Sequence, residues 1–309
     1  MKPTMKILVC DPIHLDGIER LKRAGFTVDV KPTISDEEVK NLVSMYDVLV
    51  VRSRTKVTTE VIGRGRRLKA VGRAGVGLEN IDVDAAEKRN IAVFNSPEAP
   101  AEAVAELTIG LLISMARRLP YADRTMKEGQ WTKKQLMGWQ LEGKTLGMLG
   151  LGNIGKRVAK IAKAFGMKIL ITKRTPPDPE FLSELAGEYV PLRELLMRSD
   201  VVTIHVPLTH QTRHMIGSEE LNLMKEGAYI LNTARGSVVD EKALVDALRS
   251  GKLAGAALDV YAVEPPHNLD LVTLRNVVCT PHIGGQTEES QRSTATIIAD
   301  KIIAHLKKA

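Results

Sequence analysis

Three side chains in the last third of the chain have types suited to the reduction of a keto acid. Arg235, Glu264 and His282 each follow an apolar, strand-like run. A guanidinium binds a carboxylate through two parallel hydrogen bonds. An imidazole exchanges protons near neutral pH, and an adjacent carboxylate favours its charged form. We predict that Arg235 holds a substrate carboxylate, that His282 exchanges a proton with the 2-oxygen, and that Glu264 orients and charges the imidazole.

Considered singly, these residues also have ordinary interpretations. Arg235 could be a helix cap, Glu264 a loop acid before prolines, and His282 a satisfied polar residue at a strand end. Their occurrence in this order after three successive strands favours catalysis, because the carboxyl ends of parallel strands meet at one edge of a sheet.

Hydride transfer needs a dinucleotide, and residues 150–155 have the pattern that holds one. Gly150 permits a tight turn, Gly152 lets the backbone approach a pyrophosphate, and Gly155 allows close packing of helix and strand. The helix that begins near Asn153 and Ile154 offers free N–H groups and a positive dipole end to the phosphates. An apolar run precedes this turn and a segment with helical spacing follows it. A turn without a ligand is the alternative.

The residues after the next strand depart from the usual NAD pattern. An NAD site has Asp or Glu roughly 20 residues past the glycine turn, where it binds the ribose 2′-hydroxyl. Here the strand ends in Lys173 and Arg174, and Asp178 lies beyond two prolines. We therefore expect NAD(P)(H) as the cofactor, with NADP(H) accepted through Lys173 and Arg174.

Three histidines after a later strand raise the question of a metal. His205, His210 and His214 lie within ten residues, with Pro207 between the first two. No carboxylate or cysteine completes a tetrahedral set, so we predict no metal site. We expect His205 and Pro207 to lie beside the cofactor with the hydroxyl of Thr212.

The elements that position these residues form two alternating series. Strand-like and helix-like segments alternate from residue 6 to residue 94 and again from residue 145 to residue 280, which predicts two parallel sheets wrapped by helices. With Ser96 as the N-cap and Pro97 at the first position, a long helix is predicted to run to about Arg117 and to link the two domains. A final helix is expected near residues 290–307.

Composition limits the class of protein. The 309 residues have 44% hydrophobic and 26% charged side chains, typical of two globular domains. The formal charge of +7 is spread among acids, and aromatics make up only 4%, so we expect an anionic small molecule and no nucleic acid. The sequence has no signal-peptide pattern, and none of its apolar stretches is long enough to span a membrane. Cys10 and Cys279 lie far apart in the sequence and are expected to be free thiols. The sequence therefore predicts a cytoplasmic protein that does not bind membranes.

These motifs resemble the D-isomer-specific 2-hydroxyacid dehydrogenases essentially from end to end. The resemblance rests on residues 150–155, 232–236, 258–261 and 280–285. It implies Arg235, Glu264 and His282 as the catalytic residues, Asp259 near the nicotinamide, and Thr233, Ala234 and Gly284 as further cofactor contacts. It also implies two doubly wound, Rossmann-like or flavodoxin-like domains with a cleft between them, and a homodimer. The expected substrate domain is 1–98 plus 283–309, and the dinucleotide domain is 99–282.

Cations in the first domain bear on the substrate. Residues 51–57 and 72–77 resemble those of 3-phosphoglycerate dehydrogenases, and glyoxylate reductases usually lack an arginine at position 73. We predict a phosphate clamp of Arg54, Lys56 and Arg73, with the Val76 and Gly77 amides toward the carboxylate. By the same resemblance, Lys133 reaches over from a neighbouring subunit. Ordinary surface charge is the alternative.

The sequence thus predicts oxidation of 3-phosphoglycerate, or reduction of 3-phosphohydroxypyruvate, in serine biosynthesis. A glyoxylate or hydroxypyruvate reductase is the alternative, and a nucleotide-sensing corepressor on the same fold is an alternative of another class. Since the chain ends soon after the last expected helix, we do not expect feedback control by serine through a C-terminal regulatory domain.

Overall fold

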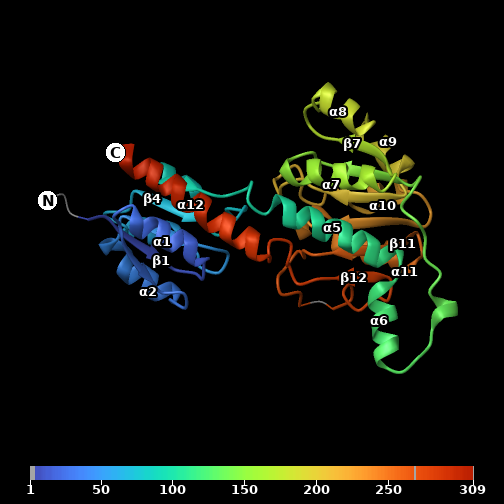
Figure 1. The fold of residues 1–309 in the computed structure, drawn as a ribbon, viewed down its shortest axis with the longest axis horizontal. Helices are drawn as coiled ribbons and strands as arrows, with labels where there is room; N and C mark the ends of the chain where they lie inside the picture. The colour runs from blue at the N-terminus through green and yellow to red at the C-terminus, as the bar shows by residue number, and fades with distance from the viewer. Residues whose placement is uncertain (1–3, 268, 309) are drawn as a thin grey trace. The chain divides into compact units, whose positions relative to one another are not determined.

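The computed structural model describes residues 4–267 and 269–308, and the chain divides into two compact units (Figure 1). The smaller unit is Met1–Ala101 with Gly285–Ala309, and the larger is Glu102–Gly284. The predicted boundaries lay three residues earlier at the first crossing and two residues earlier at the second. Each unit is a parallel α/β sheet covered by helices on both faces, so the predicted fold class is confirmed.

The smaller unit contains a five-stranded sheet in the order β2-β1-β3-β4-β5. The strands are β1 (Lys6–Val9), β2 (Thr27–Val30), β3 (Val48–Val51), β4 (Ala70–Arg73) and β5 (Ala92–Phe94). Alternate side chains of β1 enter different cores because successive residues of a strand point to opposite faces. One face is covered by α1 (Leu15–Arg23) and α12 (Glu288–Lys308), which lie side by side, and the other by α2 (Asp36–Leu42), α3 (Thr59–Arg64) and α4 (Val83–Glu87).

The last helix packs on the sheet of the smaller unit, far from its neighbours in sequence. A Cβ added at Gly72 of β4 would lie 2.8 Å from a methyl group of Ile298 and 2.9 Å from one of Ile302, both in α12. Glycine at this position therefore lets α12 approach the sheet. The return of the chain to the first unit, which the family resemblance implied, is present.

The larger unit contains seven strands in the order β12-β11-β10-β9-β6-β7-β8. They are β6 (Thr145–Leu149), β7 (Lys168–Thr172), β8 (Glu188–Tyr189), β9 (Val201–Ile204), β10 (Ala228–Asn232), β11 (Leu253–Leu258) and β12 (Val277–Cys279). The chain leaves β6 for β7 on one side and later returns to pair β9 on its other side. Ligands of such sheets bind at this switch point, outside the carboxyl ends of the strands.

Helices cover both faces of the larger sheet. α5 (Ala101–Ala116) and α7 (Asn153–Ala164) pack on one face, and α9 (Leu192–Arg198), α10 (Ser218–Leu223) and α11 (Glu241–Arg249) pack on the other. The remaining helices are α6 (Leu119–Lys127) and α8 (Pro179–Leu185), with single 3-10 turns η1 (Val43–Met45), η2 (Lys133–Gln135) and η3 (Gly236–Val238). No helix among the described residues is both long enough and apolar enough to cross a membrane.

The predicted start of the long helix was wrong. α5 begins at Ala101, and Ser96 is not its N-cap. Instead, the Ser96 hydroxyl accepts a hydrogen bond from Gly75 N–H at 3.1 Å, and Ser96 N–H donates to the Gly75 carbonyl at 2.8 Å. Pro100 favours this later start, because a proline disfavours the helical region for the residue that precedes it.

Candidate active site

A hydrogen-bonded histidine and glutamate lie on two loops that follow neighbouring strands. His282 Nδ1 is 2.6 Å from Glu264 Oε2, and Glu264 Oε1 accepts from Tyr261 N–H at 3.1 Å. The hydrogen bond to Glu264 raises the pKa of His282 and outweighs its burial. Burial raises the pKa of Glu264, but its hydrogen bonds with His282 and the Tyr261 amide hold it below the ordinary value. The pair therefore favours an imidazolium beside a carboxylate.

The backbone of His282 has a left-handed conformation, with φ of 54°. Such a conformation is uncommon outside glycine and persists where surrounding contacts enforce it. Asp259 supplies those contacts. Its buried carboxylate accepts from the Thr280 hydroxyl at 2.6 Å and from the amides of Ile283 and Gly284 at 2.8 Å. Asp259 thus holds both sides of the turn that presents His282.

Arg235 belongs to the loop after β10, held close to the Glu264 loop. A Cβ on Gly236 would lie 1.9 Å from the Tyr261 carbonyl carbon, so only glycine permits the two backbones to approach. Arg235 donates to the Ala234 carbonyl at 2.7 Å. Its charge lowers the pKa of both Glu264 and His282. The structure therefore brings the three predicted catalytic side chains together.

The glycine turn fits a dinucleotide. Gly150 has φ of 96°, and a Cβ there would lie 2.5 Å from the His205 carbonyl oxygen. A Cβ on Gly155 would lie 2.8 Å from the Gly150 carbonyl oxygen, whereas one on Gly152 would meet nothing within 4 Å. α7 begins at Asn153, and Gly152 has no side chain to cap it. Packing thus requires the first and third glycines, while the second leaves open space at a helix N-terminus, where a pyrophosphate binds.

The other predicted cofactor residues line the same carboxyl edge, but several of their polar groups bond within the protein. His205 Nε2 lies 3.0 Å from Thr203 Oγ1, and desolvation lowers the pKa of His205 to about 4, so this ring is neutral. The Thr212 hydroxyl donates to the Pro207 carbonyl at 2.6 Å, and the buried Thr233 hydroxyl pairs with that of Thr108 at 2.9 Å. In the described part of the chain, no three histidine, cysteine or acidic side chains are placed to hold a metal.

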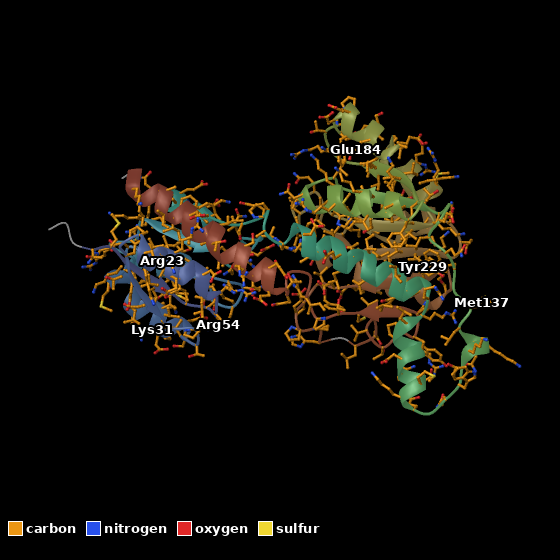
Figure 2. All side chains as sticks on the ribbon, in the orientation of Figure 1. Arg23, Lys31, Arg54, Met137, Glu184 and Tyr229 are labelled. Carbon is orange, nitrogen blue, oxygen red and sulfur yellow. The ribbon has the colours of Figure 1, made fainter. Side chains whose placement is uncertain are left out.

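In the smaller unit, Arg54 is engaged with its own backbone surroundings. Its guanidinium donates to the carbonyls of Ile34 at 2.7 Å and Cys10 at 2.6 Å. It also lies 2.9 Å from the buried carboxylate of Asp11 (Figure 2 labels Arg54). These bonds hold the guanidinium against the protein's own acceptors.

Arg52 is a cation that the sequence-based prediction passed over. β3 and β4 pair so that Val51 lies opposite Arg73, and Arg52 directly follows Val51. Arg52 and Arg73 therefore share the carboxyl edge of this sheet. Burial lowers the pKa of Arg52, and its side chain donates a long bond of 3.3 Å to the Pro12 carbonyl. The sequence contained a signal for this position, because Arg52, rather than Arg54, directly follows the strand.

Among the remaining predicted substrate residues, the structure places all but one in the smaller unit. Lys56 is exposed, and the Val76 carbonyl accepts from Asn95 Nδ2 at 2.6 Å next to Gly77. The Arg73 side chain folds over Gly75, where an added Cβ would overlap its guanidinium. Lys133 is exposed in η2 of the larger unit.

Comparison with known proteins agrees with this geometry. Residues 109–284 match the model of the D-isomer specific 2-hydroxyacid dehydrogenase NAD-binding domain. The chain belongs to the D-isomer specific 2-hydroxyacid dehydrogenase family. The matched residues lie inside the larger unit, so the glycine turn of this family member belongs to a domain that binds NAD(P)(H).

Relatives in this family are named for activities on different substrates. The chain is 49% identical to D-3-phosphoglycerate dehydrogenase of Methanocaldococcus jannaschii over 96% of its own length and 57% of that protein. It is 45% identical to hydroxypyruvate reductase of Thermotoga maritima, over 97% of this chain and 98% of the relative. A glyoxylate reductase structure from Paecilomyes thermophila superposes with a TM-score of 0.90 at 34% identity, covering 99% and 96% of the two chains. The chain thus spans little more than half of the phosphoglycerate relative.

Proposed function

We propose that the protein is an NAD(P)-dependent D-2-hydroxyacid dehydrogenase that interconverts 3-phosphoglycerate and 3-phosphohydroxypyruvate, in the manner of serine biosynthesis. The observation that supports the reaction is the His282–Glu264 pair, 2.6 Å apart and next to Arg235, at the sheet edge that carries the glycine turn. A proton donor and a carboxylate-binding cation are the two groups that hydride transfer to a 2-keto acid needs from the protein.

The mechanism follows from which atoms are already bonded. His282 Nδ1 is bonded to Glu264, so Nε2 is the atom that donates a proton to the 2-oxygen during reduction. Glu264 stabilises the imidazolium before the transfer, and Arg235 binds the substrate carboxylate through its planar guanidinium. Asp259 keeps the His282 turn in its left-handed conformation. The nicotinamide, when bound, supplies or accepts the hydride.

The phosphorylated substrate is proposed because of the cations in the smaller unit. Arg73, with Arg52 beside it at the strand ends, would bind the phosphate, and exposed Lys56 adds positive charge. We propose Arg52 in place of Arg54, because Arg54 is held by backbone carbonyls and Asp11. The amides of Val76 and Gly77 are proposed to face the carboxylate.

We further propose that the protein acts as a homodimer in the cytoplasm. Residues 117–138 leave α5 and return to it, since Trp139 N–H donates to the Ala116 carbonyl at 3.2 Å. We call this stretch the excursion. Hydrogen bonds within it order the excursion, yet it exposes Trp131 (78%) and Met137 (86%), the latter labelled in Figure 2. Aromatic residues and methionine are enriched at protein interfaces, and Lys133 lies between these two in the sequence. Buried Cys10 and partly buried Cys279 are free thiols, which suits a reducing compartment.

A substrate panel tests the proposal. Phosphohydroxypyruvate, hydroxypyruvate, glyoxylate and pyruvate would each be reduced with NADH and with NADPH, and kcat/KM compared. We expect phosphohydroxypyruvate to be preferred. Preference for glyoxylate or hydroxypyruvate would instead support the reductase function named for the Thermotoga maritima relative. Turnover of none of them would favour the corepressor alternative.

A further inference from the structure

The residues that follow β7 lie next to the glycine turn. β6 and β7 are parallel, with Leu149 opposite Thr172. Gly150 N–H donates to the Thr172 carbonyl at 2.9 Å, so the chain leaves β7 directly beside the turn. Lys173 and Arg174 are therefore the first side chains at the position where a dinucleotide-binding sheet meets the adenosine ribose.

A hydrogen bond holds the backbone at this position, and the nearest acid that follows in the sequence caps the next helix. The Tyr189 hydroxyl donates to the Lys173 carbonyl at 3.0 Å. The Asp178 carboxylate accepts from Glu180 N–H at 2.9 Å as the N-cap of α8, so one of its oxygens is engaged at the start of that helix.

Lys173 and Arg174 differ from Lys160 and Arg198 on the flanking helices. Lys160 of α7 pairs with Glu184 at 2.8 Å, and Arg198 of α9 pairs with Glu188. Within residues 4–267 and 269–308, no carboxylate pairs with Lys173 or with Arg174, which is exposed. Directly after β7 the cofactor domain thus presents two adjacent positive charges, at the position where an NAD site usually has a carboxylate.

The charge of the protein at this position determines which of the two dinucleotides, NAD(H) or NADP(H), is bound more tightly. The 2′-hydroxyl of NAD(H) is best held by a carboxylate, which would repel the 2′-phosphate of NADP(H). That phosphate carries close to two negative charges and forms strong charge-assisted hydrogen bonds with lysine and arginine. We propose that Lys173 and Arg174 bind the 2′-phosphate and that the protein prefers NADP(H) to NAD(H). This inference rests on the proposed function, because it assumes that the glycine turn receives a dinucleotide.

Direct binding provides the test, independently of turnover. Calorimetric titration of the protein with NADPH, NADH, 2′,5′-ADP and 5′-AMP compares ligands that differ in the 2′-phosphate, with and without nicotinamide. We expect NADPH to bind about tenfold more tightly than NADH or better, and 2′,5′-ADP to exceed 5′-AMP similarly. In a double variant, Lys173→Ala with Arg174→Ala, NADPH affinity falls to that of NADH while NADH affinity stays unchanged. Lys168→Ala, which removes an exposed charge at the other end of the same strand, leaves both affinities unchanged.

The outcomes separate this inference from the proposed function. If NADH binds as tightly as NADPH to the unmodified protein, or if the double variant keeps the preference for NADPH, the 2′-phosphate assignment is wrong while the dehydrogenase proposal stands. If NADPH is preferred but no 2-keto acid is turned over, the assignment holds and the proposed reaction fails. Binding of neither dinucleotide overturns both.

Discussion

At the scale of single residues, the charge on Glu264 sets the pH range in which His282 can donate a proton. Reduction requires the imidazolium, so kcat/KM for reduction should fall as pH rises through the raised pKa of His282. In Glu264→Gln the carboxylate that raises this pKa is gone, and the fall should occur at lower pH. Oxidation needs the neutral imidazole, so kcat/KM for oxidation should rise with pH. In Glu264→Gln this rise should also occur at lower pH. Profiles of kcat/KM in both directions measure this.

Removing the imidazole gives a separate check on the same residue. His282→Ala should reduce kcat by about 10²–10⁴-fold, the usual contribution of general acid–base catalysis, without weakening dinucleotide binding. Near-normal kcat in this variant would show that another group exchanges the proton.

Two arginines separated by one residue should behave differently when replaced. Arg54→Ala removes hydrogen bonds to three carbonyls and an ion pair with buried Asp11, so the free energy of unfolding should fall by about 1–3 kcal/mol. Arg52→Ala should leave stability nearly unchanged but raise KM for phosphohydroxypyruvate much more than KM for hydroxypyruvate. Denaturant unfolding and steady-state kinetics distinguish the two effects. Equal KM changes for both substrates in Arg52→Ala would argue against a phosphate contact.

At the scale of elements, the glycine turn combines a packing requirement with a binding one. Gly150→Ala places a methyl group against the His205 carbonyl at a left-handed φ, which should cost about 1–3 kcal/mol of stability. Gly152→Ala should unfold like the unmodified protein, because nothing lies within 4 Å of the added carbon, yet bind NADPH and NADH more weakly by occupying the pyrophosphate position. Thermal unfolding and dinucleotide titration of the two glycine variants check these expectations. Unchanged affinity in Gly152→Ala would contradict the placement of the pyrophosphate.

The elements also show what a sequence pattern can predict. Alternating apolar runs located the main strands, because burial on both faces of a parallel sheet leaves a clear signal. The two-residue strand β8 is too short and too exposed to produce one. The start of α5 was misplaced because Ser96 and Pro97 form a good local start signal, while Pro100 and the bonds of Ser96 to Gly75 decide against it.

The sequence predicted the positions of the proposed catalytic side chains better than those of the proposed phosphate-binding cations. Arg235, Glu264 and His282 are each placed by a strand end, so the order of the strands suffices to bring them together. Arg54 is placed by Asp11 and by carbonyls 20 and 44 residues away in sequence, which no local pattern reveals. Likewise, the role of Asp259 in holding the His282 turn depends on backbone amides rather than on residue types.

At the scale of the whole molecule, the excursion is the segment on which the proposed dimer depends. Trp131 is 78% exposed, and burying a tryptophan at an interface centre typically contributes about 2 kcal/mol or more. Trp131→Asp should therefore weaken dimerisation about thirtyfold or more, as measured by sedimentation equilibrium. Met197→Asp is the matched control, because Met197 of α9 is a 51% exposed apolar residue of the same unit outside the excursion. If Lys133 serves the active site of the partner subunit, Trp131→Asp should also raise KM for phosphohydroxypyruvate at low protein concentration and less at high concentration, where dimers form. A protein that sediments as a monomer and still shows full activity would refute both the dimer and this role of Lys133.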